Sequence, residues 1–213
     1  MPGASLLALH LPHAHRTAMS APPDRIETER LWMRPTRAAD AEATHYWQVD
    51  PEVVRFLGGI QHPTVESFRA FLERVEVKYD AYAAAGLPWV ALVVFEKGVE
   101  RPIGTALCKP APEGEGDGRR DSEEIEIGWH LARQAWGRGF ATELGRAMRD
   151  RAFELGGVPH VNAFVDRENT ASARVAERCG LRRVEPSPRF YGGADRYRMT
   201  RAEWEARGGS GSG

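Results

Sequence analysis

Gln134-Ala135-Trp136-Gly137-Arg138-Gly139-Phe140-Ala141 is the stretch that decides the fold of this chain. It follows a strand-like run and opens an amphipathic helical pattern over residues 140–155. The first N–H groups of a helix have no intrahelical acceptor, and the helix dipole makes that end positive. Gly137 and Gly139 permit unusual backbone angles and remove side chains from the approach of a ligand. The segment therefore predicts a turn that binds a diphosphate through its backbone amides, with Arg138 as an additional charged contact.

Two other interpretations of this turn stay open. One is a plain tight turn with two glycines and no ligand. The other is a dinucleotide-binding fold, which needs a third glycine and an acidic residue about 20 positions further on. Thr142 stands where that third glycine belongs, although Asp166 does end a later strand. Too little chain follows Asp166 to complete a second nucleotide-binding half, so this interpretation is disfavoured.

The rest of the chain alternates between strand and helix patterns. Runs of alternating or continuous apolar residues predict strands, and apolar residues at spacings of three and four predict helices. A hairpin-rich first half, followed by strand, helix, strand and helix, predicts an α+β domain with a mixed sheet. The expected strands cover 26–35, 89–96, 102–109, 123–131, 160–166, 181–184 and 195–200, the helices cover 37–49, 64–85, 140–155, 169–179 and 201–206, and a loop rich in Gly and Pro covers 110–122.

Length and composition fit one globular domain over residues 25–207 of the 213. Residues 1–24 are expected to form a disordered tail, in which Met19 is a candidate start, and residues 208–213 resemble a flexible Gly/Ser linker or a cloning remnant. A net charge of −1 gives no general attraction for nucleic acid, and no apolar run approaches the about 20 residues that span a membrane. Two distant cysteines favour a reducing compartment, so we expect a cytoplasmic protein, and no histidine spacing predicts a metal site.

The motif Gln134-x-x-Gly137-x-Gly139 matches the Q/R-x-x-G-x-G/A signature of the GNAT N-acetyltransferase superfamily. The flanks strengthen this resemblance, with E-I-E-I-G-W-H-L at 124–131 before the turn, and N-T-A-S at 169–172 and E-R-C-G-L at 177–181 after it. The opening E-T-E-R-L at 27–31 and the closing M-T-R-A-E-W at 199–204 resemble the branch of ribosomal-protein alanine N-acetyltransferases. The resemblance covers about residues 25–207 and does not specify an acceptor.

This resemblance implies a mostly antiparallel central sheet with helices on both faces and a splayed pair of central strands, 123–131 and 160–166. Acetyl-CoA is the implied co-substrate, with its diphosphate on the glycine turn and its pantetheine arm between the splayed strands. An amine attacks the thioester directly in a ternary complex, and a backbone N–H near 129–131 stabilises the oxyanion. The implied cofactor-binding residues are Trp129, His130, Leu131, Gln134, Trp136, Gly137, Arg138, Gly139, Phe140, Ala141, Thr142, Asn169 and Ser172.

The attacking amine must be neutral, so a base is needed near neutral pH. Glu126 is the predicted general base, acting directly or through water, and Glu124 on the same strand face is the alternate; both also fit exposed strand residues. For the proton that the departing thiolate requires, the resemblance implies Ser172, with Tyr191 as the alternative acid. Ser172 also fits a first-turn serine that only satisfies backbone donors, and Asn169 fits a cofactor contact or a helix start.

The acceptor is expected to be an amine on a small molecule or a peptide. Seven acidic residues between 113 and 126 favour a cationic amine if this segment borders the acceptor entrance, and otherwise form a solvated loop. A protein N-terminus, a polyamine, an aminoglycoside-like antibiotic and a small amino compound all remain candidates. The oligomeric state is open, with a homodimer among the options. The alternative function is a non-catalytic acyl-CoA-binding module that kept the turn and lost turnover.

Overall fold

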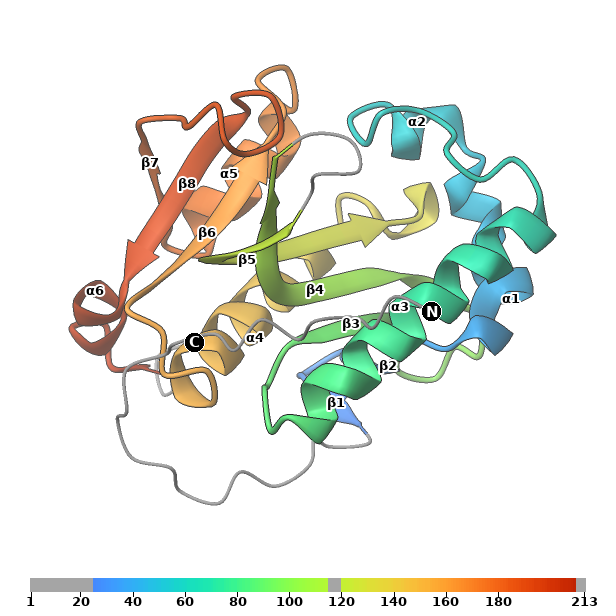
Figure 1. Ribbon diagram of the computed structural model, residues 1–213, viewed down its shortest axis with the longest axis horizontal. Helices are drawn as coiled ribbons and strands as arrows, with labels where there is room; N and C mark the ends of the chain where they lie inside the picture. The colour runs from blue at the N-terminus through green and yellow to red at the C-terminus, as the bar shows by residue number, and fades with distance from the viewer. Residues whose placement is uncertain (1–24, 115–119, 210–213) are drawn as a thin grey trace, which may run out of the picture.

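The computed structural model describes residues 25–114 and 120–209, which fold around one sheet (Figure 1). The sheet has the strand order β1-β2-β3-β4-β5-β6-β8-β7. Its strands are β1 (Ile26–Glu27), β2 (Leu31–Pro35), β3 (Val90–Glu96), β4 (Pro102–Glu113), β5 (Arg120–Leu131), β6 (His160–Val165), β7 (Arg182–Val184) and β8 (Asp195–Thr200). The helices are α1 (Ala41–Gln48), α2 (Pro51–Val54), α3 (Val65–Ala84), α4 (Phe140–Glu154), α5 (Thr170–Arg178) and α6 (Arg201–Glu205), with short 3-10 turns η1 (Ala38–Asp40) and η3 (Arg133–Ala135).

The strand pairs are antiparallel except at the centre of the sheet. There β5 and β6 run parallel and are paired at a single position, Glu126 opposite Asn162. By contrast, β6 pairs with β8 along its whole length, from His160 opposite Thr200 to Val165 opposite Asp195. Strands that meet at one position diverge beyond it, so β5 and β6 form the expected splay. The predicted α+β fold with a mostly antiparallel sheet is confirmed.

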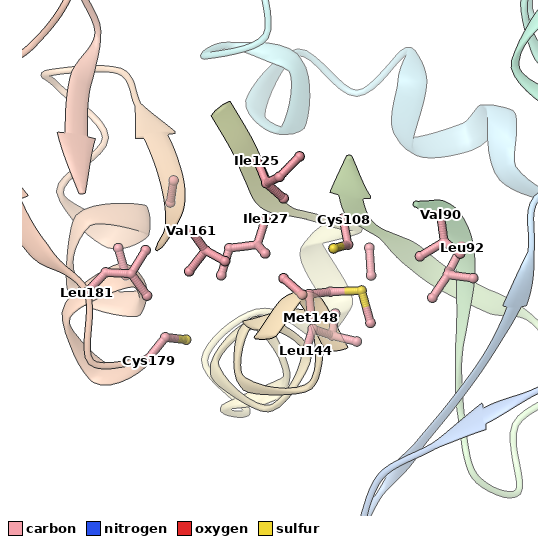
Figure 2. Packing of buried hydrophobic residues seen from close by; sticks show 14 of the residues in the cluster. Val90, Leu92, Cys108, Ile125, Ile127, Leu144, Met148, Val161, Cys179 and Leu181 are labelled. Atoms are coloured by element: carbon pink, nitrogen blue, oxygen red, sulfur yellow. The ribbon is translucent and has the colours of Figure 1, made fainter. Parts of the chain in front are cut away.

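Helices cover both faces of the sheet. Figure 2 shows Leu144 and Met148 of α4 pointing at Leu92, Cys108 and Ile127 of the central strands, and these side chains belong to one buried cluster. Successive side chains of a strand point to opposite faces. The residues next to Cys108 and Ile127, which are Lys109 and Glu126, therefore face the opposite side, where Figure 1 shows α3 across the sheet. One face of the sheet therefore packs on the apolar core under α4, and the other carries the polar side chains of Lys109 and Glu126.

Most predicted elements are found within one or two residues of their expected ends. The long helix α3 starts where the sequence predicts, because the Thr64 hydroxyl accepts the Ser67 N–H at 3.2 Å and caps the first turn. Helix α4 starts directly after the two glycines, and Asn169 caps α5. The short helix α2 was not predicted.

Two predicted elements are wrong. Residues 110–113 and 120–122 do not belong to a loop as predicted, because β4 continues to Glu113 and β5 already begins at Arg120. Pro110 and Pro112 suggested a break, but they flank a shift in the β4–β5 register, where a missing N–H donor is tolerated. The strand expected over 26–35 is divided into β1 and β2, since Thr28 N–H donates to the Leu31 carbonyl at 3.0 Å and closes a turn.

The predicted tail over 1–24 lies outside the described residues, as do 115–119 and the last four residues of the predicted linker. Gly208 and Gly209 of that linker are described, and the Gly208 N–H donates to the Glu205 carbonyl at 3.0 Å. Among the helices of 25–114 and 120–209, none has the length and apolar character needed to cross a membrane.

Candidate active site

The glycine turn presents a row of free backbone donors at the start of α4. Gly137 and Gly139 adopt φ values of +73° and +83°, which L-residues with side chains rarely adopt. Within the described parts of the chain, the N–H groups of residues 137, 138, 139, 140 and 141 have no hydrogen-bond acceptor, and the first engaged amide of the helix is that of Thr142. The space beside Gly137 is open. Five consecutive donors at a positive helix end fit a diphosphate.

Charged side chains next to the turn are engaged with the protein. The Arg138 guanidinium donates to Glu96 on β3 at 2.7 Å, so its predicted contact with a phosphate would require it to leave this partner. Arg30, which the sequence analysis missed, donates to the Arg138 carbonyl at 2.8 Å and to Glu143 at 2.8 Å. Both guanidinium groups lie over the ring of Phe140, at 4.8 and 4.5 Å. Among the described residues, the backbone amides are therefore the donors at this turn that have no protein partner.

The other predicted cofactor residues anchor this turn. Trp136 donates its indole N–H to the Leu131 carbonyl at 2.7 Å, and Gln134 donates to the Tyr46 hydroxyl at 2.6 Å. These contacts attach the turn to β5 and to α1. On the α4 side, a side chain at Gly145 would come within 3.1 Å of the Trp129 ring, so this glycine lets the helix pack closely on β5.

Glu126 lies at the start of the splay and is engaged by two residues from distant segments. Its side chain is nearly buried, at 8% exposure. Lys109, its opposite neighbour on β4, forms an ion pair with one carboxylate oxygen. The Tyr191 hydroxyl donates to the same carboxylate, with oxygen–oxygen distances of 2.7 and 2.8 Å. Two residues that the sequence analysis proposed for separate catalytic roles are thus in direct contact.

Comparisons with known proteins agree with this geometry. The family model "Acetyltransferase (GNAT) domain" matches residues 30–182. The chain belongs to the GNAT acetyltransferase family. It is 28% identical to an FsC-acetyl coenzyme A-N(2)-transacetylase from Aspergillus fumigatus over 84% of this chain and 77% of that protein. An acetyltransferase structure from Agrobacterium tumefaciens matches with a TM-score of 0.64 and 26% identity, over 88% of this chain and 99% of the other.

Two further solved structures are similar in fold alone, because their sequence identity is low. An aminoglycoside acetyltransferase AAC(6')-Ib in complex with coenzyme A matches with a TM-score of 0.63 and 21% identity, over 83% of this chain and 98% of the other. A Vibrio cholerae protein described as a ribosomal-protein-serine acetyltransferase matches with a TM-score of 0.64 and 18% identity, over 85% and 99% of the two chains. The GNAT resemblance predicted from the glycine motif is confirmed, and the chain is an N-acetyltransferase of this family whose co-substrate is acetyl-CoA.

The Tyr191 side chain of this acetyltransferase reaches Glu126 from the segment between β7 and β8. Its backbone has a φ of +47°, and its ring packs on Phe164 of β6 with ring centres 5.4 Å apart. Phe190 packs on the same ring at 5.0 Å. This segment has no regular pattern of apolar residues, so its contact with Glu126 was not predictable. The contact between Lys109 and Glu126 could have been predicted from the sequence. Pairing their two strands in a hairpin places both side chains on the same face of the sheet.

A second carboxylate, Glu124, belongs to a half-buried polar network around Asn162, which we call the Asn162 network (Glu124, His160, Asn162, Arg196 and Arg198). Asn162 is fully buried and donates to Glu124 at 2.9 Å and to the Ile125 carbonyl at 3.1 Å. Its own carbonyl accepts from Arg196 and Arg198 at 3.0 Å each. Burial alone would raise the pKa of Glu124, but hydrogen bonds from His160, Asn162 and Arg198 lower it to about 2. Glu124 therefore serves to connect β5, β6 and β8, and its predicted role as alternate base is disfavoured.

His130 shares the face of Glu126 by the two-residue strand period. Burial lowers the pKa of its imidazole to about 4, and the positive charge of Lys109 adds to this effect. The ring is therefore neutral near pH 7.

Ser172 and Asn169 lie at the first turn of α5. The Asn169 side chain accepts the Ser172 N–H at 3.0 Å and caps the helix, as one of its two predicted roles requires. The Ser172 hydroxyl makes no hydrogen bond to any described residue, including Glu126 and Tyr191. It is half-buried.

The acidic run over 113–126 is largely neutralised by basic partners. Glu113 pairs with Arg120 and Arg189, Asp121 pairs with Lys78, and Glu124 pairs with Arg196 and Arg198. Glu115 and Asp117 lie outside the described residues, so the expected steering effect of the run is tested only in part. Across the described residues, no three His, Cys, Asp or Glu side chains gather in a metal-binding arrangement.

Proposed function

We propose that this enzyme transfers the acetyl group of acetyl-CoA to a primary amine by direct attack in a ternary complex. The contact between Tyr191 and Glu126 at the start of the splay is the observation that carries this proposal. The free amides of 137–141 bind the diphosphate of the co-substrate, and the gap between β5 and β6 accommodates its pantetheine arm. The acceptor then approaches from the polar face that holds Glu126.

The proton of the amine leaves through Tyr191. Counted over the whole residue, Glu126 is 6% exposed and Tyr191 is 41% exposed, so the tyrosine is the more accessible of the two to an acceptor. As the amine nitrogen bonds to the acetyl carbonyl carbon, the Tyr191 oxygen takes a proton from the nitrogen and passes its own proton to the Glu126 carboxylate. Lys109 contacts one oxygen of that carboxylate, and the Tyr191 hydroxyl lies within hydrogen-bond distance of both. Glu126 is thus the base, acting through a side chain rather than through water.

Collapse of the tetrahedral intermediate breaks the carbon–sulfur bond and releases the CoA thiolate. Ser172 supplies the proton to the sulfur and regains one from solvent, while Glu126 returns its proton to solvent through Tyr191. No described residue bonds to the Ser172 hydroxyl, which lies in the first turn of α5, at the positive end of that helix. A backbone N–H of 129–131 that faces the splay stabilises the oxyanion before collapse. This division leaves Tyr191 to the amine side and Ser172 to the thiol side.

The acceptor is an amine of a small molecule or a peptide. One relative is named as an N(2)-transacetylase and a fold neighbour as an aminoglycoside acetyltransferase, so acceptors differ widely among similar proteins. Because most acidic side chains of the run over 113–126 have basic partners, a strong preference for highly cationic amines is not supported. A cytoplasmic location remains a prediction from cysteine content.

A double-mutant cycle on thiol release tests the mechanism. Glu126→Gln and Tyr191→Phe should each lower kcat about 100-fold with the best amine of a panel. The loss should be largest at low pH, where most of the amine is protonated and a base is needed to remove its proton. If the two residues form one relay, the double variant is no slower than the slower single variant. Glu123→Gln, on the same strand and exposed without a partner among the described residues, is the matched control and should retain full turnover.

Two outcomes would contradict the mechanism. Multiplicative losses in the double variant would show that Tyr191 and Glu126 act independently. Binding of acetyl-CoA without thiol release for any amine, peptides included, would favour the alternative of a non-catalytic acyl-CoA-binding module.

A further inference from the structure

A hollow lined by four arginines lies away from the glycine turn. It has a volume of about 220 Å³ and is formed by the middle of α4, the end of α5 and the segment after α6. Its lining residues are Arg146, Arg149, Arg178, Met199, Trp204, Arg207 and Gly209. Arg146 lies six residues into α4, about 9 Å along the helix from the turn. The hollow is therefore a separate feature from the amides that hold the diphosphate.

The positive charge in this arginine hollow is only partly compensated. Asp150 contacts it and already accepts from Arg149 at 2.8 Å and from the Trp204 indole at 2.7 Å, and Glu203 acts electrostatically on Arg207. Arg149 is nearly buried and also donates to the Cys179 carbonyl at 2.7 Å. Arg146 makes one long bond of 3.4 Å to the Arg178 carbonyl. Within the described ranges, the guanidinium groups of Arg178 and Arg207 have no hydrogen-bond acceptor.

Helix capping explains part of this arrangement. The carbonyl end of α5 is negative, so Arg146 and Arg149 stabilise it. Capping does not require Arg207, which comes from the segment after α6. Its guanidinium lies 2.9 Å from the place that a side chain at Gly180 would occupy, and Gly180 has a φ of +90°. Because Gly180 has no side chain, the Arg207 guanidinium can occupy this space beside the hollow.

We propose that the arginine hollow binds a phosphate group. Guanidinium groups donate pairs of hydrogen bonds that match phosphate oxygens, and an anion relieves the repulsion among Arg146, Arg178 and Arg207. The phosphate has two possible sources, a free phosphate-bearing metabolite or the 3′-phosphate of the coenzyme bound at the nearby turn. Both present the same dianionic group to the arginines.

Calorimetric titration of the full chain with inorganic pyrophosphate tests this site, in the presence of saturating 3′-dephospho-CoA so that the amides of the glycine turn are already occupied. We expect saturable binding by the wild-type protein, weakened at least about tenfold in the variant with Arg178→Gln and Arg207→Gln. Both side chains are exposed, so the variant should fold. Arg174→Gln is the matched control, because this exposed arginine lies on α5 but does not line the hollow. It should bind pyrophosphate within about twofold of wild type.

A second titration separates the two sources. If pyrophosphate binds equally well when saturating CoA replaces 3′-dephospho-CoA, the hollow takes a free phosphate compound. If CoA competes and 3′-dephospho-CoA does not, the hollow takes the 3′-phosphate of the coenzyme. Absence of saturable pyrophosphate binding, or equal binding by the double variant and wild type, would overturn the proposal while leaving acetyl transfer untouched.

Discussion

The glycine turn and the face around Glu126 are built from contacts of very different range. The free amides of 137–141 belong to consecutive residues, and the Trp136 indole that fixes the turn bonds to Leu131, five residues away. Glu126 instead meets Lys109 from a neighbouring strand and Tyr191 from 65 residues along the chain. The co-substrate end of the site is thus a local feature, whereas the acceptor end depends on how the strands and the segment after β7 pack.

This difference has a consequence for how each end responds to change. A local turn is altered by residues within it and is insensitive to distant packing. A face assembled from several strands depends on distant contacts, among them the Asn162 network that connects β5, β6 and β8. Substitutions in the two regions should therefore separate co-substrate affinity from the stability of the sheet.

The largest expected effect is at the centre of the Asn162 network. Asn162→Leu removes a buried amide that bonds to Glu124, Arg196 and Arg198, and leaves these charged groups only the ion pairs among themselves. We expect the free energy of unfolding, measured in urea, to fall by about 3 kcal/mol. Affinity for CoA, measured where the variant is still folded, should change less than about twofold. A loss of stability below about 1 kcal/mol would show that the Asn162 network contributes little to the stability of the sheet.

A smaller effect is expected at the glycine turn, in affinity rather than stability. Gly139→Val forces a β-branched side chain into a φ of +83° next to the free amides. Affinity for CoA should fall about 30-fold by calorimetry, which corresponds to about 2 kcal/mol. Gly98→Val is a matched control, since Gly98 has the same φ of +83° in the turn after β3 and its position is open. Equal CoA affinity in the two variants would contradict the assigned role of the turn.

The smallest effect concerns the pH dependence of stability at His130. Its pKa in the folded protein is about 4, so the unfolded chain binds a proton first as the pH falls below about 6.5. The contribution of the neutral ring to stability is present above about pH 6.5 and is lost as the pH falls toward 4. Allowing for partial exposure, we expect a loss of about 1 kcal/mol in wild type that is missing in His130→Gln. Parallel pH profiles in urea would show that the ring is not the cause.

The sequence predicted the turn well because its determinants are local. Two glycines, a helix pattern and a preceding strand define the backbone path and the free donors without reference to the rest of the chain. Asn169 was predicted as a helix start for the same reason. The prolines at 110 and 112 misled this reasoning, because whether a proline ends a strand depends on which way its missing N–H would have pointed in the ladder.

The acceptor face was predicted only as a set of candidate residues. Glu126, Tyr191 and Ser172 came from the family resemblance, but nothing in the sequence says that Tyr191 contacts Glu126 or that Ser172 stays apart from both. Lys109 and Arg30 were missed, since each acts on a residue that lies far along the chain. The direction of a side chain from an irregular segment depends on packing, here of Phe164 against Phe190 and Tyr191.

By itself, the amino-acid sequence determined the order of strands and helices, the donor-rich turn and membership of an acetyltransferase family. Hydrogen bonding between near neighbours and the periods of 2 and 3.6 residues are encoded within short windows, so they can be read there. Only the tertiary structure decided that Tyr191 and Lys109 meet on one carboxylate, that Asn162 joins three strands, and that four arginines surround one hollow. These encounters depend on strand register and on the path of irregular segments, which are properties of the whole packed chain.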